Sequence, residues 1–353
     1  MTATSGARSG RRFGTSEVVR FVRDNPLIPL IVLLVVLVLV LEQIRPGIVG
    51  ERWIANTVKF AVPLAILAAA QTLTMLTGGI DLSVGATMYI TAAVVGTLLQ
   101  QDVSYLIAIP IGIAAGTSWG LLNAFLIAKV GLVPFVATLA TLTVGRGVGL
   151  LLTESRQFIL PPEMAYAATD VFGIPLPVFL LPAVVIAAVV FLRFTPMGRQ
   201  IYAMGNDRDA AKKAGLHVVR LTGSVYVISG FCASLAGVIA ISQQGSVSAG
   251  IGEGVEFRAI AAAVLGGTSL FGGVGAVFPG TVIGVLLVQM ISTGLVYLQV
   301  DLYLQDMVAA SVIFFAVLVD AQRMRLLSRL ERRNIRVDKG ESSADARAAP
   351  APP

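Results

Sequence analysis

Long apolar stretches separated by short polar segments occupy most of the chain. The hydrocarbon core of a bilayer is about 30 Å thick, so a helix that crosses it needs about 20 apolar residues. Measured against that length, the sequence predicts about ten membrane-spanning helices, near residues 26–44, 54–77, 82–99, 104–128, 132–152, 177–194, 222–243, 257–271, 276–297 and 303–320. We therefore expect an all-α, polytopic membrane protein in which some helices are broken or short.

The distribution of basic residues predicts which side of the membrane each end of the chain occupies. Cytoplasmic segments carry an excess of Lys and Arg. With ten spans, both arginine-rich termini, Lys129 and the basic segment 193–220 all fall on one side. The eighth stretch, residues 257–271, is short for a crossing and could be re-entrant or broken, but nine spans would place the C-terminal arginines outside. We expect both termini to be cytoplasmic.

Composition supports a membrane protein with two polar ends. Hydrophobic residues make up 56% and charged residues 13% of the chain, whereas soluble domains carry about 25% charged residues. The net charge of +6 follows from the basic segments on one side of the membrane and does not indicate nucleic-acid binding. We expect a basic cytoplasmic N-terminus at residues 1–25, a transmembrane domain at residues 26–320, and a basic, disordered cytoplasmic tail at residues 321–353.

The sequence lacks the residues that several kinds of chemistry need. The single cysteine, Cys232, lies in an apolar stretch, so neither an intramolecular disulfide nor a cysteine-based metal cluster is expected. The segment GTSWG at 116–120 fits the pattern of a hydrolase nucleophile, but it lies inside a predicted span, far from the only histidine, His217. No G-x-x-x-x-G-K-[ST] segment occurs. We expect no catalytic site, metal or cofactor in this chain.

The longest polar stretch between spans, residues 195–222, contains the signals of a short helix. Asn206 is a favourable N-cap, two aspartates follow it in the first turn, two lysines stand in the last turn, and Gly215 suits the C′ position. A helix of about nine residues is marginal in water by itself. It therefore needs support, and two possibilities remain open: it lies on the membrane face of its own domain, or it docks against a partner protein.

Two glycine-rich segments interrupt the predicted spans. In GGIDLSVGA, at 78–86, the paired glycines end one span, and Asp81 or Ser83 can cap the next. Such a break can bind polar ligands or be a tight interhelical turn, and its expected cytoplasmic position favours a gate or a cap. In GGTSLFGGVG, at 266–275, glycines surround Thr268 and Ser269 and disfavour a continuous helix.

Polar residues inside the apolar stretches are candidates for a hydrogen-bonding path. Neutral ones predominate and include Gln71, Asn123, Thr138, Thr141, Gln243, Gln244 and Gln289. These side chains can bind an uncharged polar solute or form bonds between helices, and both interpretations stay open for each. Arg146 is a charge well inside a span, where it lines the path or reaches the interface. Glycines with helical spacing, such as Gly112, Gly116 and Gly120, predict close helix packing.

Three segments together resemble one known family. GGIDLSVGA at 78–86, GRQIYAMGNDRDAAKKAGL at 198–216 and EFRAIAAAVLGGTSLFGGVG at 256–275 are similar, in the same order, to the permease subunits of ribose-type ABC sugar importers. The resemblance covers residues 55–320 and is weakest after the ninth span. It implies a bacterial inner-membrane permease for a monosaccharide.

The resemblance also implies partners and residue roles. The permease would form a homodimer or pseudo-dimer in the lipid bilayer, with a separate cytoplasmic ATPase that carries ATP and Mg²⁺ and an extracytoplasmic sugar-binding protein. The loop helix would transmit motion from the ATPase through Gly205, Asn206, Asp207, Ala210, Ala211 and Gly215. The translocation path or gate would include Asp81, Ser83, Asn123, Thr138, Arg146, Gln243, Thr268 and Ser269.

Two alternative functions remain at this stage. Permeases for branched-chain amino acids resemble this chain in architecture and have a similar loop, but the two glycine-rich segments are closer to the sugar branch. A proton-coupled carrier would have similar hydropathy but needs a titratable residue within the spans. The sequence offers only Asp81, at a break, for that role.

Overall fold

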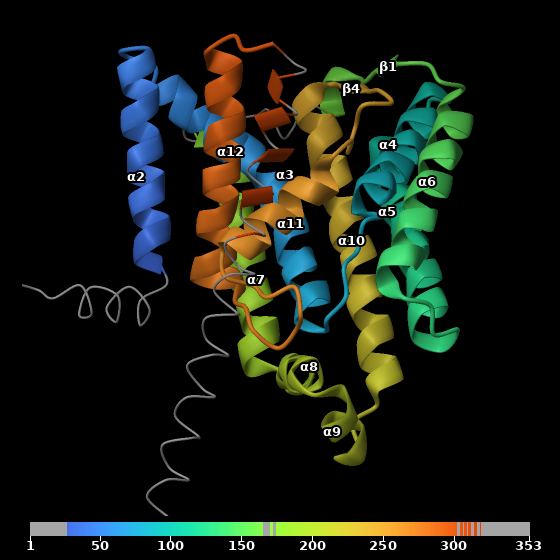
Figure 1. The fold of residues 1–353 in the computed structure, drawn as a ribbon. Coiled ribbons are helices and arrows are strands. Elements are labelled where there is room, and N and C mark those ends of the chain that lie inside the picture. The colour runs from blue at the N-terminus through green and yellow to red at the C-terminus, as the bar shows by residue number, and fades with distance from the viewer. Residues whose placement is uncertain are drawn as a thin grey trace, which may run out of the picture.

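The computed structural model describes residues 27–164, 170–171, 174–301, 304–305, 307–308, 310–311, 314–315 and 318. Within these residues the chain is almost entirely helical (Figure 1), which confirms the predicted helical class. The only described strands are two antiparallel pairs of two residues each, β1 (Phe158–Ile159) with β4 (Ser246–Val247) and β2 (Asp170–Val171) with β3 (Ile174–Pro175). Both predicted polar ends and half of the residues of the tenth predicted span lie outside the described residues.

Each of the first nine predicted spans contains a helix. Their bounds are α2 (Leu27–Ile44), α3 (Glu51–Leu76), α4 (Val84–Gln100), α5 (Tyr105–Ala124) continued by η1 (Phe125–Lys129), α6 (Pro134–Thr153), α7 (Leu176–Phe194), α10 (Val218–Gln244), α11 (Val255–Leu265), and η3 (Val277–Thr281) continued by α12 (Val282–Tyr297). Between α7 and α10 lie α8 (Pro196–Asn206) and α9 (Arg208–Lys213). Five helices are long and apolar enough to cross a membrane alone, and α7 with α8, bent by 71°, makes a sixth candidate.

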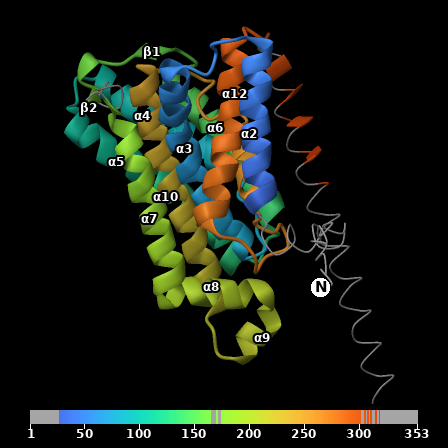
Figure 2. The same cartoon turned by 90° about the vertical axis from the view of Figure 1, so that its left-hand side faces the viewer.

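The helices form a bundle with distinct ends. In Figure 1, α8 and α9 lie at one end, and β1 and β4 lie at the opposite end. The main buried cluster joins α3, α4, α10, α11 and α12. Figure 2 shows α2 alongside α12 at the edge of the bundle, where it exposes apolar side chains such as Val32, Val36 and Leu39. A surface of this kind is stable in lipid but not in water.

Close helix packing depends on glycine, as the sequence predicts. A Cβ added to Gly230 of α10 would lie 2.6 Å from the Cα of Gly120 in α5. A Cβ added to Gly284 of α12 would lie 2.0 Å from the carbonyl oxygen of Ala262 in α11. Lipid supplies no hydrophobic driving force between helices, so this backbone proximity and its dispersion contacts hold the bundle together.

Two helices begin inside the bundle instead of at its ends. Residues 77–83 extend from the α8–α9 end towards the start of α4, and residues 248–254 extend from the β1–β4 end towards α11 (Figure 1). The first turns of α4 and α11 meet, because a Cβ on Gly85 would lie 2.2 Å from the Gly252 carbonyl oxygen. The eighth predicted stretch, 257–271, is short and interrupted, as its glycines predict: α11 has 11 residues, about 16 Å in length, and the glycines after Leu265 end it.

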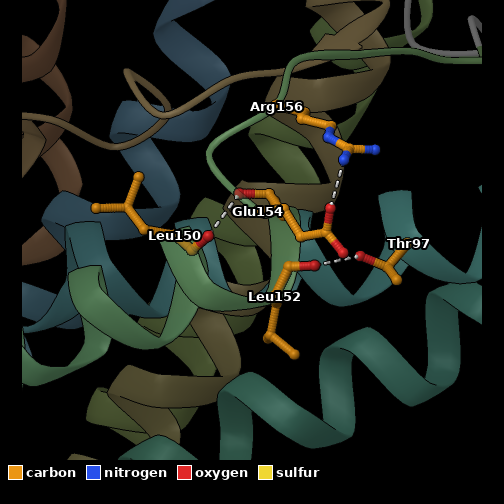
Figure 3. A network of polar contacts seen from close by, with 6 residues as sticks. Thr97, Leu150, Leu152, Glu154 and Arg156 are labelled. Carbon is orange, nitrogen blue, oxygen red and sulfur yellow. Dashed lines mark hydrogen bonds and ion pairs between the residues drawn. The ribbon is translucent and has the colours of Figure 1, made fainter.

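The outer end of α6 is fastened to α4 by surface contacts. Figure 3 shows Thr97, whose hydroxyl donates to the Leu152 carbonyl oxygen at 3.3 Å, and the ion pair between Arg156 and Glu154 at 2.8 Å. Both charged side chains are exposed, and exposed pairs of this kind contribute little stability. The tight contacts of the bundle therefore lie deeper, at the glycines and at the buried polar groups described below.

We predict that Gly230→Ala destabilises the protein by about 1–3 kcal/mol, because the new methyl group forces α5 and α10 apart. Differential scanning fluorimetry of the purified protein in detergent measures the effect. Gly147→Ala on α6 is the control, since no heavy atom lies within 4 Å of its added Cβ. Equal melting temperatures for the two variants would contradict the proposed packing.

Candidate functional site

The break between α3 and α4 is organised around the buried carboxylate of Asp81, which is 1% exposed. Its Oδ1 accepts hydrogen bonds from the Ser83 backbone N–H at 2.9 Å and the Ser83 hydroxyl at 2.7 Å. Its Oδ2 accepts from the Ser229 hydroxyl of α10 at 2.7 Å. Of the two capping residues that the sequence allows, Ser83 occupies the N-cap position of α4 without a side-chain capping bond, and Asp81 bonds to the N–H of Ser83.

A chain of side-chain hydrogen bonds continues from this carboxylate across two more helices. The Asn123 amide of α5 donates to the Ser83 hydroxyl at 2.7 Å. The Thr141 hydroxyl of α6 donates to the Asn123 Oδ1, also at 2.7 Å. All of these residues are buried, and a fully satisfied buried network fixes its members in one arrangement. The break is thus tied to α5, α6 and α10 together.

The backbone of the break is also satisfied by side chains. The Thr138 hydroxyl of α6 lies 3.2 Å from the Ile80 carbonyl oxygen and 2.8 Å from the Pro134 carbonyl oxygen of its own helix, and it can donate its single proton to either. The Gln71 amide of α3, oriented so that both its groups are used, donates to the Asp81 carbonyl oxygen at 3.1 Å and accepts from the Asp81 N–H at 3.3 Å. These neutral groups replace the helical bonds that the break removes, as a bilayer requires.

The second glycine-rich segment forms a compact turn between α11 and η3. The Ser269 N–H donates to the Val274 carbonyl oxygen at 2.8 Å, and the Ser269 hydroxyl accepts from the Phe271 N–H at 3.1 Å. Thr268 is fully buried, and its hydroxyl has no hydrogen-bond partner in the described structure. The turn is therefore held by backbone bonds, and its glycines supply the left-handed conformations, with φ of +95° at Gly272 and +72° at Gly273.

The three sequence segments that carry the family resemblance meet at one point near the end of α8. The Gly273 N–H donates to the Leu76 carbonyl oxygen at the end of α3, at 3.0 Å. A Cβ on Gly205 of α8 would lie 1.7 Å from that same oxygen, and a Cβ on Gly272 would lie 2.8 Å from the Gly205 carbonyl oxygen. We call this contact of Gly205, Leu76, Gly272 and Gly273 the glycine joint. Side chains at its glycines would separate α8 from both breaks.

Tyr202 adds a polar contact beside the glycine joint. Its hydroxyl donates to the Gly275 carbonyl oxygen at 2.8 Å. Burial raises the pKa of the Tyr202 phenol, so the group stays protonated and able to donate at neutral pH. Ile201, one residue earlier in α8, is buried against Leu73, Leu76 and Val277. Both polar and apolar contacts therefore hold α8 against α3 and η3.

The predicted loop helix exists, with one correction at its start. Asp207, not Asn206, is the N-cap of α9: its carboxylate accepts from the Asp209 N–H at 3.0 Å and the Ala210 N–H at 2.9 Å. Asn206 is instead the last residue of α8, a helix that the signals of the loop do not predict. The lysines in the last turn and the left-handed C′ glycine, Gly215 with φ +83°, are confirmed. Asp207 takes the N-cap position because its extended backbone directs its carboxylate towards the free amides in the first turn of α9.

The two alanines of α9 face opposite ways. Ala211 is buried with Met204 of α8 and with Val218 and Leu221 of α10. Ala210 is exposed, together with the charged side chains of the helix. One face of α9 is therefore held by its own chain, and the other is free.

The remaining path candidates lie apart from the break network. The Gln243 amide donates to the Lys59 carbonyl oxygen at 2.8 Å and links α10 to α3. Arg146 donates from Nη1 to the Ala249 and Ile251 carbonyl oxygens, at 3.2 and 2.7 Å, and lies over the Tyr89 ring. Arg146 therefore holds the segment before α11, on the other side of the α4 start from Asp81.

Several residues that shape the site were not found from the sequence. Thr195 and Pro196 begin α8 as N-cap and N1 residue, a readable signal. Ser229 and Tyr226 give no signal, because single polar residues in apolar helices are common. Glu256, which the sequence places at the outer interface in either a structural or a gating role, is instead a second buried carboxylate in the first turn of α11. Among the described residues, no group of three or more His, Cys, Asp or Glu side chains could hold a metal ion.

The fold and the site define a multi-pass helical membrane protein whose broken helices are joined to a polar loop at one end. Residues 53–317 match the family described as branched-chain amino acid transport system / permease component. The match covers more than half of the chain, and the chain belongs to this family.

Characterised relatives cover most of the chain. The ribose import permease protein of Escherichia coli K12 is 34% identical over 330 residues, which are 91% of this chain and 99% of that protein. The ribose import permease protein of Bacillus subtilis is 36% identical over 294 residues, 82% of this chain and 91% of its own. The D-allose permease protein of E. coli K12 is 36% identical over 260 residues, 72% of this chain and 78% of its own. No solved structure matches the chain.

We predict that Asn123→Ala and Thr141→Val each destabilise the protein by about 1–3 kcal/mol, because each leaves a buried polar partner unsatisfied. The double variant should lose less than the sum of the two, with a coupling of at least about 0.5 kcal/mol. Melting temperatures of the wild type, the two single variants and the double variant, all in one detergent, measure the losses and their coupling. Ser118→Ala, at an exposed hydroxyl of α5, is the control; strict additivity would refute the network.

Proposed function

We propose that this chain is the membrane-spanning permease subunit of an ATP-binding cassette importer that moves a monosaccharide into the cell. Its family is a permease family, and relatives that match over most of its length are permeases for ribose and allose. ATP hydrolysis is assigned to a separate ATPase subunit.

The observation that carries this proposal is the glycine joint. The loop containing α8 and α9 is in direct backbone contact with both broken segments, through Gly205, Leu76 and Gly273. A force applied to the exposed face of α9 would therefore reach the starts of α4 and η3 with little intervening flexible structure. A permease driven by a partner ATPase needs such a connection between the partner and the path.

The proposed topology has ten spans and cytoplasmic termini, in a bacterial inner membrane. Basic residues gather at the α8–α9 end of the described bundle: Lys129, Arg193, Arg199, Arg208, Lys212, Lys213 and Arg220. The positive-inside bias makes this end cytoplasmic. The described end of α2 at Leu27 lies at the same end (Figure 1). The tenth predicted span would return the chain to that side.

The partners follow from the same orientation. A cytoplasmic ATPase would contact the exposed face of α9, around Ala210 and its charged neighbours. A sugar-binding protein would deliver substrate at the opposite end, where β1 and β4 lie. Two permease copies, identical or similar, would form the complete path. Alternation between inward and outward openings would use the joined breaks as moving parts.

The cargo is proposed to be a neutral sugar and not a branched-chain amino acid. The family description mentions amino acids, but the two relatives above that match most of this chain are named for ribose. The polar groups around the first break are mainly hydroxyls and amides, which suit sugar hydroxyls. An aliphatic amino acid would need an apolar pocket and two opposite charges.

Uptake by a host that lacks this gene tests the function. We expect the deletion to abolish ATP-dependent uptake of one labelled monosaccharide from a panel that includes ribose and allose, while leucine uptake remains. Re-expression should restore it. Depletion of ATP should stop uptake while an uncoupler alone, with ATP maintained, should not. Loss of leucine uptake alone would refute the sugar assignment, and uptake that stops with the uncoupler at constant ATP would indicate a proton-coupled carrier.

A further inference from the structure

A second buried carboxylate lies where the two internal helix starts meet. Glu256, in the first turn of α11, is 5% exposed. Its Oε2 would lie 2.5 Å from a Cβ added to Gly85, so the carboxylate stands beside the first turn of α4. No side chain intervenes there, because Gly85 and Gly252 bring the two backbones into contact.

Glu256 differs from Asp81 in how its oxygens are used. Both oxygens of Asp81 accept hydrogen bonds from serine groups. The Oε2 of Glu256 has no partner in the described structure, although it is shielded from solvent. A buried carboxylate oxygen without a donor is costly, and such exceptions call for an explanation. Asp81 is explained by its bonds to Ser83 and Ser229, whereas Glu256 has an unused acceptor.

Arg146 provides donors on the same side of the α4 start. Its Nη1 donates to the Ile251 carbonyl oxygen at 2.7 Å, one residue before Gly252, whose carbonyl oxygen meets Gly85 beside the Glu256 carboxylate. The two hydrogen bonds of Arg146 described above both leave from Nη1, and a guanidinium has five N–H donors in a fixed fork. An acceptor and a set of donors therefore face the point where α4 and α11 meet.

We propose that Glu256, assisted by Arg146, is a hydroxyl-binding subsite for the transported monosaccharide at the junction of α4 and α11. The inference rests on the function proposed above and goes beyond it by naming the substrate-contacting group. In the state seen here the junction is closed by the contact of Gly85 and Gly252. When the joined breaks move, α4 and α11 separate, and the carboxylate accepts hydrogen bonds from sugar hydroxyls while the guanidinium donates to others.

The position of the subsite agrees with its physical surroundings. Irregular backbone at membrane depth is tolerated only where protein buries it or where it lines a cavity. Discontinuous helices with adjacent N-termini are used by transporters to bind polar substrates. The segments before α4 and α11 come from opposite ends of the bundle (Figure 1). A shift of one segment would open their meeting point to one side of the membrane, and a shift of the other segment would open it to the opposite side.

The test uses the full chain reconstituted in proteoliposomes with its ATPase and its sugar-binding protein. At saturating loaded binding protein, we expect Glu256→Gln to lower the maximal uptake rate by about tenfold, because a charged acceptor is lost. Glu256→Asp should retain part of the rate. Glu51→Gln is the matched control: it removes the same charge from an exposed side chain in the first turn of another helix, α3, and should leave uptake unchanged.

Deoxy analogues of the sugar separate substrate contact from a structural role. The wild-type rate should fall when the analogue lacks the hydroxyl that Glu256 binds, and the Glu256→Gln variant should be insensitive to that one deletion. A variant that transports as fast as the wild type would overturn the proposal. A uniform loss for the sugar and all analogues, with a lower melting temperature, would assign Glu256 a structural role. In either case ATP-dependent uptake by the wild type still supports the proposed function.

A second variant keeps the test decisive if Glu256→Gln fails to fold. Glu256→Cys in a Cys232→Ser background offers a single thiol, because Cys232 is the only native cysteine. We expect a small methanethiosulfonate reagent to modify it during ATP turnover, and transported sugar to slow the modification severalfold. Modification that the sugar leaves unchanged, or no modification during turnover, would overturn the proposal.

Discussion

The constraint on which the structure depends is that a bilayer supplies no hydrogen bonds to a broken helix. The chain breaks its helices twice inside the bundle, before α4 and after α11. At the first break, Asp81 and neutral groups from four helices replace the missing bonds. At the second, the turn bonds mainly to itself. Such breaks cost stability, so their retention needs a functional reason, and movement at a transport path is the reason proposed here.

The glycine joint connects this constraint to the loop at the end of the bundle. Backbone groups of α3, α8 and the second turn are in contact because Gly205, Gly272 and Gly273 carry no side chains. Backbone contacts are less compliant than contacts between long side chains, so displacement of α8 passes directly to both breaks. The polar network around Asp81 then links that displacement to α5, α6 and α10. One connected set of contacts thus extends from the exposed face of α9 to the junction of α4 and α11.

Much of this arrangement could be predicted from the sequence, and the rest has identifiable physical causes. The helix positions, the breaks and the glycine packing follow from hydropathy and composition, which act locally. Gly215 as a C′ residue follows from local backbone geometry, and so does the bond from the Ser83 N–H to Asp81 two residues earlier. The meeting of Gly205 with Gly273 and of Gly85 with Glu256 could not be predicted, because both join segments far apart in the chain. The burial of Glu256 could not be predicted either, because a charge next to an apolar stretch usually lies at the membrane interface.

The central claim, that the glycine joint carries the driving force, is tested most directly by the number of sugar molecules transported per ATP hydrolysed. The ratio should be measured in proteoliposomes for the wild type, Gly205→Ala and Gly223→Ala. Gly223 lies in α10 and meets only ordinary contacts, at 3.6 Å or more, when a Cβ is added. We predict that the ratio falls at least about tenfold in Gly205→Ala alone, with ATP hydrolysis retained, because the methyl group separates α8 from Leu76. An unchanged ratio in Gly205→Ala would contradict the account.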